Sequence, residues 1–322
     1  MTPASLALWA GCCALTAVLT WMAIRYARRA GLIDAPGERR SHVQATPRGG
    51  GVAIVVVMGL ASLLLCLAGR LAVVEVALAL AGLGLVAVPG WIDDHRSLPV
   101  WPRLLAHALA AVCVAVLAWR ASQSLLHAAV GFAASLALVN IWNFMDGING
   151  IATTQAGLVA AGFAVLLWPS AWAMLALCLV ACALGFLPFN FPRARIFLGD
   201  VGSGSLGYLL ALFGVLAWPA SGWSLAVVLP LIAFAVDAGF TLLRRMLAGE
   251  RWWTPHASHA YQRLARRWGH PAVTGAYGLF TACAVLVALQ FSTPLSPLPL
   301  LLALLLLVSA AAAWWKVTRH WA

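Results

Sequence analysis

Long, uninterrupted apolar runs dominate this chain of 322 residues, of which 63% are hydrophobic and 9% are charged. A soluble domain typically carries about 25% charged residues, so this chain lacks the polar surface needed in water. Runs of roughly twenty apolar residues suit membrane-spanning helices, whereas the strands of a membrane barrel would alternate apolar and polar residues. The sequence therefore predicts an all-α integral membrane protein with a single polytopic domain over residues 1–322.

About eleven transmembrane helices are expected from these runs. The run at 205–218 is short for a span, and an earlier start would lengthen it. All seven cysteines lie inside the runs and are interpreted as small packing residues. The eleven runs are 5–25, 51–69, 71–91, 103–119, 125–145, 151–168, 171–189, 205–218, 223–243, 273–291 and 297–315.

Basic residues are distributed very unevenly between the two sides that alternating helices create. One side receives 18 of the 20 Lys and Arg residues, all except Arg70 and Arg120. Such a bias marks the cytoplasmic side, which predicts an outward N-terminus and a cytoplasmic C-terminus. The net charge of +11 follows from the same bias, so the sequence gives no reason to expect nucleic-acid binding.

Four of the nine acidic residues lie where an apolar run meets a cytoplasmic loop: Asp93, Asp94, Asp146 and Asp200. A carboxylate within a bilayer costs about 2.5–3.5 kcal/mol, so such residues usually have a function. Four acids at one membrane level could converge on a cation, and hard oxygen ligands suit Mg²⁺. A magnesium site is therefore expected, with Mn²⁺ as a substitute.

Each acidic stretch also has a purely structural interpretation. Asp93, Asp94 and Arg96 could form a local ion cluster. Asp200 could cap a helix after a Gly-rich bend, and the Asp-Gly and Asn-Gly pairs of "NFMDGING" could simply form a turn. The occurrence of all these features on one face favours a shared site.

The cytoplasmic loop at 244–272 contains a cluster of basic and imidazole side chains. His256 and His259 are spaced to share one face of a helix, with Arg263 four residues further on. This stripe suits phosphate oxygens. Two alternatives remain: the two histidines could bind a metal, or the arginines could contact anionic lipid headgroups. Acids, amides and basic groups at one membrane face together suggest phosphoryl transfer between a cytosolic and a lipid substrate.

The motifs resemble those of the polyprenyl-phosphate N-acetylhexosamine-1-phosphate transferases of glycosyltransferase family 4. The resemblance extends from about residue 34 to residue 267, in family order. "SHAYQRL" and "DGING" look most like the branch that initiates O-antigen or related surface glycans. The matching stretches are "DAPGERRSHVQATPRGGG", "WIDDHRSLP", "NIWNFMDGINGIATTQAG", "FLPFNFPRARIFLGDVGSGSLGY", "LIAFAVDAGFTLLRR" and "HASHAYQRLARR".

The resemblance implies that UDP-N-acetylhexosamine donates its sugar-1-phosphate to undecaprenyl phosphate, with UMP as the second product and Mg²⁺ required. It also implies a bacterial cytoplasmic membrane location. By resemblance, the metal contacts Asp200 and Asn143, while Asp93 and Asp94 act at the lipid phosphate. Asp93 is the expected base, and the reverse assignment stays open. The resemblance further implies catalytic roles for Asp146, beside the nucleotide, and His259, at the diphosphate. It also implies substrate contacts by Asn149, Asn190, Phe197, His256 and Arg263.

One position departs from the family pattern, because Asn149 stands where many members carry a second Asp. A mechanism that needs two acids in this loop is therefore in doubt. The triple-His motif of the peptidoglycan branch is also absent, which argues against a muramyl-pentapeptide donor.

Other functions considered are a transporter and a non-catalytic protein that binds lipid-linked sugars. The sequence fixes neither the hexosamine nor the oligomeric state; a homodimer is one option, and contacts with membrane lipids are expected.

Overall fold

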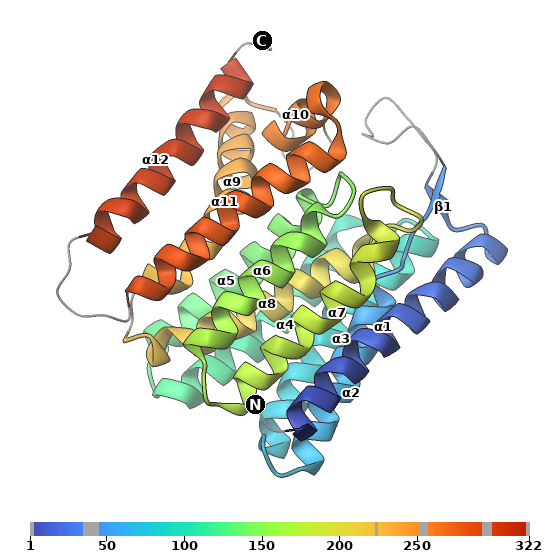
Figure 1. The fold of residues 1–322 in the computed structure, drawn as a ribbon, viewed down its shortest axis with the longest axis vertical. Coiled ribbons are helices and arrows are strands. Elements are labelled where there is room, and N and C mark those ends of the chain that lie inside the picture. Colours follow the sequence, from blue (N-terminus) through green and yellow to red (C-terminus); the bar gives the residue numbers. More distant parts are fainter. Residues whose placement is uncertain (1–2, 35–44, 223–224, 251–256, 292–297, 320–322) are drawn as a thin grey trace.

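The computed structural model is built almost entirely from helices (Figure 1) and describes residues 3–34, 45–222, 225–250, 257–291 and 298–319. A two-stranded antiparallel ribbon pairs β1 (Ile33–Asp34) with β2 (Thr46–Pro47). Two 3-10 turns, η1 (Leu225–Val227) and η2 (Leu229–Leu231), precede α9. The α-helices are α1 (Pro3–Arg29), α2 (Val52–Leu67), α3 (Val73–His95), α4 (Val100–Ser122), α5 (Leu125–Phe144), α6 (Ile151–Leu166), α7 (Ala171–Asn190), α8 (Gly199–Ala220), α9 (Ile232–Leu247), α10 (Ala260–Trp268), α11 (His270–Gln290) and α12 (Leu298–Arg319).

The predicted all-α membrane fold is confirmed, although the count of eleven spans is not. One α-helix overlaps each predicted run, and α10 lies in the polar loop between two runs. Within the described residues, eight helices are long and apolar enough to cross a membrane: α1, α3, α4, α5, α7, α8, α11 and α12. The apolar helices α2 and α6 have 16 residues each, which is shorter than a typical span.

Helix α8 forms the centre of the bundle and packs against α3, α4, α5 and α6. It is much more buried than the other spanning helices, with 83% of its apolar window inside the protein. The helix begins at Gly199, earlier than the predicted run at 205. Its first turns therefore include Asp200 and the sequence "VGSGS", which places an acid at one end of the most buried helix.

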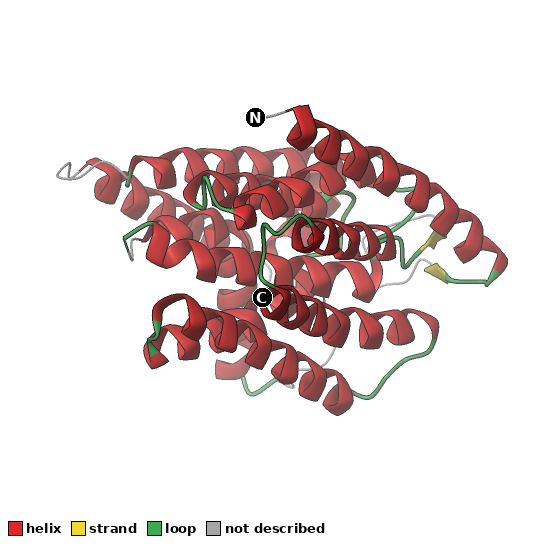
Figure 2. Cartoon of the chain, turned by 90° about the horizontal axis from the view of Figure 1, so that it is seen from below, coloured by secondary structure: helices red, strands yellow, loops and turns green. Residues whose placement is uncertain are grey.

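Large aliphatic side chains cover the outside of the bundle. On α12, Leu300, Leu301, Leu304 and Leu305 are each more than half exposed. Such extensive apolar surface is unsuited to water and fits contact with lipid hydrocarbon. Helix α12 forms one flank of the bundle and α1 lies on the other side of the molecule (Figure 1), while the short strands lie at one margin (Figure 2).

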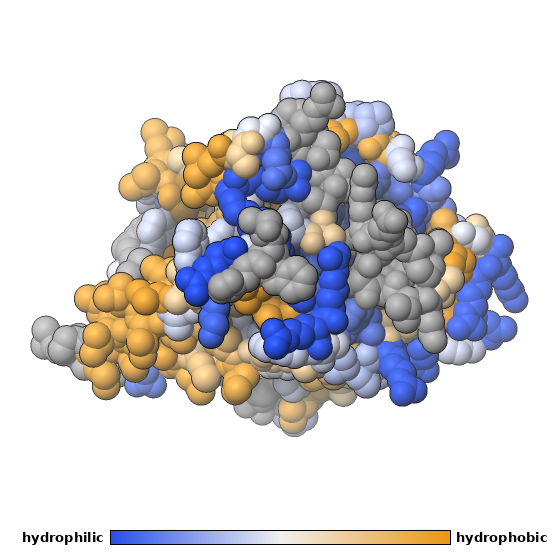
Figure 3. Space-filling model, turned by 90° about the horizontal axis from the view of Figure 1, so that it is seen from above, coloured by the Kyte–Doolittle hydropathy of each residue, from blue (hydrophilic) through white to orange (hydrophobic). Residues whose placement is uncertain are grey.

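Consecutive helices run in opposite directions through most of the chain, so α3, α5 and α7 end where α4, α6 and α8 begin. We call this the acidic end, because it carries Asp93, Asp94, Asp146 and Asp200. Figure 3 views the molecule from above and shows hydrophilic residues gathered over this end, with hydrophobic residues along part of the rim. The arrangement brings loops that are distant in sequence to one level of the bundle.

Candidate active site

Asp94 joins the end of α3 to the start of α8. Its carboxylate is 2% exposed and accepts hydrogen bonds from the backbone N–H groups of Asp200, at 3.0 Å, and Val201, at 3.2 Å. The first N–H groups of a helix lack partners within the helix, and the positive end of its dipole favours an anion. Asp94 therefore caps α8 from another helix and brings the "DD" and "GD" motifs together, as predicted.

Two glycines allow this close approach of backbone to carboxylate. A Cβ atom at Gly90 would lie 2.6 Å from the nitrogen of Val201 and 2.7 Å from the carbonyl carbon of Asp200. Gly199 has a φ of +72°, and a Cβ atom there would lie 2.7 Å from Oδ1 of Asp94. Only glycine fits both positions without displacing the backbone. The Gly-rich sequence at 199–205 is therefore a helix start rather than a free bend.

Arg103, at the start of α4, bridges two of the predicted acids. Its guanidinium lies 3.0 Å from Oδ2 of Asp93 and 2.9 Å from Oδ2 of Asp200. Asp93 also accepts a 2.6 Å hydrogen bond from the N–H of Leu98. The three bridged side chains are 17–28% exposed, so they remain within reach of a ligand. Arg103 was not among the predicted site residues. The alternative of a local ion cluster with Arg96 is wrong, because Asp93 pairs with Arg103 and Asp94 caps α8.

Asn143 lies in the last turn of α5, and Asp146 lies in the joint that follows it. Both side chains are partly exposed. Burial, and then the negative charges of Asp200 and Asp94, raise the pKa of the Asp146 carboxyl well above its usual range. Within the described residues the Asp146 carboxylate has no hydrogen-bond or ion-pair partner. Asp146 is therefore close enough to Asp200 and Asp94 for their charges to raise its pKa, and its oxygens are available for a ligand.

The oxygen atoms at this site fit the chemistry of a magnesium ion. Carboxylates of Asp146 and Asp200 and the amide oxygen of Asn143 are hard ligands, and the mutual repulsion of the acids would be offset by a divalent cation. Among the described residues, no three His, Cys, Asp or Glu side chains are already arranged around one metal position. Arg103 instead balances part of the negative charge.

Asn190 and Asn149 hold the loop between α7 and α8. Asn190 is 2% exposed; its amide donates to the carbonyl of Ile196 at 2.9 Å, and its Oδ1 accepts from the hydroxyl of Thr153 at 3.3 Å. Asn149 donates from its side chain to the carbonyl of Pro192 at 2.9 Å. Both predicted substrate-binding amides thus have partners within the protein and shape the loop that carries Phe197, which is partly exposed.

Helix α10 is capped by Asp237 of α9. The Asp237 carboxylate is 2% exposed and accepts from the N–H groups of Ala260, at 2.8 Å, and Tyr261, at 2.9 Å, and from the hydroxyl of Tyr277 at 2.7 Å. The Nδ1 atom of His259 lies 3.6 Å from Asp237. Asp237 therefore faces the helix bundle rather than lipid, as its charge requires.

Tyr261 connects α10 to the joint that carries Asp146. Its buried hydroxyl donates to the carbonyl of Phe144 at 3.0 Å. Burial, followed by the charges of Asp237 and Asp146, raises the pKa of this hydroxyl well above its usual range, so it remains a donor. The ring of His259 also stacks near Phe144, with centroids 6.3 Å apart. His259 thus lies next to the predicted site.

The predicted histidine stripe is wrong in its local structure. Residues 257–259 are not helical, and His259 has the extended backbone of an N-cap residue. The reason is that Asp237 binds the first N–H groups of α10 and fixes its start at Ala260. Arg263 donates to the carbonyl of Thr318 in α12 at 3.3 Å. His256 lies outside the described residues.

The Asp237→Ala variant is expected to lower the stability of the protein in detergent. It leaves two buried N–H groups and the hydroxyls of Tyr277 and Thr241 without this acceptor. Each such group costs about 1–3 kcal/mol. The temperature of thermal unfolding and the transfer activity should both be lower than in the wild type. Tyr277→Phe, which removes one of these donors, should have a smaller effect. Unchanged stability and activity in Asp237→Ala would show that the Asp237 network does not hold α10.

Comparisons with known proteins identify the family of the chain. Residues 75–218 match glycosyl transferase family 4. The chain is 30% identical to decaprenyl-phosphate N-acetylglucosaminephosphotransferase of Mycolicibacterium smegmatis, over 77% of this chain and 73% of that protein. The chain belongs to glycosyl transferase family 4. The matched segment of this chain contains Asp93, Asp94, Asp146 and Asp200.

Other family members show how far the likeness extends. A probable undecaprenyl-phosphate N-acetylglucosaminyl 1-phosphate transferase of Bacillus subtilis is 28% identical, over 77% of this chain and 73% of its own length. A phospho-N-acetylmuramoyl-pentapeptide-transferase of a Synechococcus strain is 30% identical over 45% of this chain and 44% of its own. The family assignment makes the chain a multi-pass membrane sugar-1-phosphate transferase and decides against a transporter.

Proposed function

We propose that this protein transfers N-acetylhexosamine-1-phosphate from a UDP-sugar to undecaprenyl phosphate and releases UMP. The observation that carries the proposal is the Arg103 side chain, which bridges Asp93 and Asp200. Asp94 binds the backbone of Asp200, and Asp146 lies near enough for the charges of Asp200 and Asp94 to raise its pKa. The site combines anionic oxygens with a cation at one end of a membrane bundle. A lipid phosphate and a water-soluble diphosphate can meet there. We further propose that the product starts an O-antigen-like surface glycan.

In the proposed reaction, the acceptor phosphate attacks the β-phosphorus of the donor directly. Asp93 takes the proton of the lipid phosphate. Arg103 holds the Asp93 and Asp200 side chains in position through its two ion pairs. Asp94 is less accessible to the lipid phosphate, because it is 2% exposed and caps the start of α8, whereas the Asp93 side chain is 17% exposed. Asp200, Asn143 and Asp146 would hold Mg²⁺, which would stabilise charge on the donor diphosphate when bound. Positioning and electrostatics then supply most of the rate enhancement.

The remaining site residues are assigned to the donor. Phe197 would stack on the uracil, and Asn190 and Asn149 would keep its loop in place. His259 would contact the diphosphate from the α10 side, together with His256 and Arg263. In this structure Arg263 contacts α12, so the proposed contact requires its side chain to turn.

Purified protein tests the proposal with a radiolabelled UDP-N-acetylhexosamine and undecaprenyl phosphate. Label should enter the lipid phase in the presence of Mg²⁺, and UMP should appear in equal amount. Omission of the lipid should abolish both signals. A binding protein without catalytic activity would retain the UDP-sugar unchanged, and that result would refute the proposal.

We also propose that the acidic end faces the cytoplasm of a bacterial inner membrane, with the N-terminus in the periplasm. The positive-inside bias supports this orientation. In a cysteine-free background, Ser258→Cys should react with an impermeant thiol reagent only after cells are opened. Gln123→Cys, at the other end of the bundle, should react in intact cells. Labelling of position 258 from outside would contradict the orientation.

A further inference from the structure

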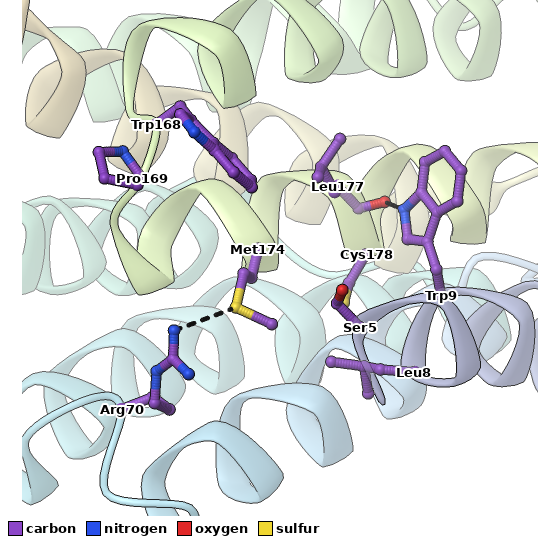
Figure 4. Close-up of a pocket in the computed structure, with 9 residues that line it drawn as sticks. All are labelled: Ser5, Leu8, Trp9, Arg70, Trp168, Pro169, Met174, Leu177 and Cys178. Atoms are coloured by element: carbon purple, nitrogen blue, oxygen red, sulfur yellow. Dashed lines mark hydrogen bonds between the residues drawn. The ribbon is translucent and has the colours of Figure 1, made fainter. Parts of the chain in front are cut away.

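A cavity of about 390 Å³ lies at the end of the bundle opposite the acids (Figure 4). Its walls come from the first turns of α1, the turn between α2 and α3, the connection between α6 and α7, and the first half of α7. Six of the residues that line it are Ser5, Trp9, Arg70, Trp168, Met174 and Leu177. This volume falls within the range of about 300–1,000 Å³ that is typical of small-molecule sites.

Arg70 supplies the charge of this cavity. Its guanidinium points toward Met174, and the sulfur atom lies 3.9 Å from it (Figure 4). Within the described residues no carboxylate lies within 4 Å of Arg70. A thioether is a weak acceptor and does not balance a full positive charge. The cavity therefore presents a cation to any anion that enters it.

Arg120, the other basic residue at this end of the bundle, has different surroundings. It lines a separate cavity of about 250 Å³ together with the acidic side chain of Glu75. That cavity holds one charge of each sign, whereas the lining of the Arg70 cavity contains no acidic residue. Of the two cavities, the Arg70 cavity is thus the one with electrostatic preference for an anion.

The other walls of the Arg70 cavity are suited to hydrocarbon. Leu8, Leu177 and Met174 are apolar, and the indole N–H of Trp9 is already donated to the carbonyl of Leu177. The Trp168 side chain is 56% exposed at the rim. Tryptophan is enriched where the hydrocarbon core meets the lipid headgroups. A cation next to apolar walls at this level matches an amphiphile rather than a free ion.

We propose that this cavity binds a phospholipid with an anionic headgroup, with the lipid phosphate at Arg70 and an acyl chain against Leu8, Met174 and Leu177. The proposed ligand is a membrane lipid of the leaflet at the end opposite the active site. The inference does not depend on the transferase reaction, because none of the cavity residues belongs to the proposed active site.

Native mass spectrometry of the purified full-length protein tests this site with phosphatidylglycerol as the probe. The Arg70→Gln variant should bind the first phosphatidylglycerol about fivefold more weakly, as expected for loss of one basic group near a membrane surface. Arg70→Lys should retain most of the affinity. Arg120→Gln is the matched control, since it removes one charge from the same end of the protein and should leave the first binding step unchanged.

Two competitors separate a lipid site from a simple anion site. A short-chain phosphatidylglycerol should displace the bound lipid, whereas inorganic phosphate at the same concentration should not. Equal binding by Arg70→Gln and wild type, or an equal loss in Arg120→Gln, would overturn the proposal. Displacement by inorganic phosphate as effective as that by the short-chain lipid would also overturn it. Thermal unfolding of each variant establishes that the fold is retained.

Discussion

Asp200→Asn is expected to reduce Mg²⁺-dependent transfer by about 10²–10³-fold, the usual effect of removing one electrostatic element that stabilises developing charge. The substitution should leave the fold intact. The backbone N–H of Asp200 still donates to Asp94, and the remaining amide oxygen can still accept from Arg103. The measurement is kcat at saturating magnesium, together with the magnesium concentration needed for half-maximal activity.

Two further variants sharpen this result. Asn143→Ala removes a neutral oxygen from the proposed metal site and should also abolish most of the transfer activity. Glu75→Gln removes an acid from the other end of the bundle and should have little effect. If Asp200→Asn keeps near-normal activity and magnesium dependence, then Asp200 is not a metal ligand and the assignment of the site is wrong.

Asp93→Asn is expected to lower the rate by about 10²-fold at pH 6, within the range typical of general base catalysis. The second pKa of a free phosphate monoester is about 6. The neighbouring carboxylates raise the pKa of the bound acceptor phosphate, so it loses its proton without help only as the pH rises further. The defect of Asp93→Asn should therefore shrink above about pH 8, relative to the wild type at the same pH. A full pH–rate profile of both proteins measures this difference.

A covalent mechanism would give a different result for Asp93. If Asp93 attacked the donor itself, the Asn variant would be inactive at every pH. UDP-sugar incubated with wild-type enzyme in the absence of lipid would then also give a burst of UMP and a phosphosugar adduct on the protein. Direct attack predicts neither. A stoichiometric adduct on Asp93 or Asp94 would overturn the base role and leave the substrates unchanged.

Much of the fold could be predicted because lipid restricts the backbone to helices whose length matches the bilayer. The predicted runs and the observed helices therefore coincide in order. The exact starts of polar helix segments were not predicted, although an earlier start of the run at 205–218 was considered. Residues 199–204 contain three glycines and an acid, which indicate a bend by propensity, yet they form the first turns of α8 because Asp94 caps them and the surrounding helices bury them. A helix was also predicted around His259 and Arg263, but it begins only at Ala260, because Asp237 binds its first N–H groups.

The site was predictable only in part. The convergence of Asp94 and Asp200 followed from their positions at one membrane level. Arg103 was missed, because in the sequence it resembles any basic residue that flanks an apolar run; its place ten residues after Asp93, beside a predicted acidic site, was the available signal. The link from Asp237 to His259 depends on how α9 and α10 pack, which the spacing of residues along the chain does not specify.

The fate of the donor's β-phosphate tests the central claim most directly. A UDP-N-acetylhexosamine with radioactive phosphorus in the β-phosphate should be incubated with the purified protein, Mg²⁺ and undecaprenyl phosphate. Sugar-1-phosphate transfer moves the β-phosphate with the sugar, so the label should appear in the lipid product while unlabelled UMP is released. Ordinary sugar transfer would leave the label on released UDP, and that result would contradict the proposed reaction.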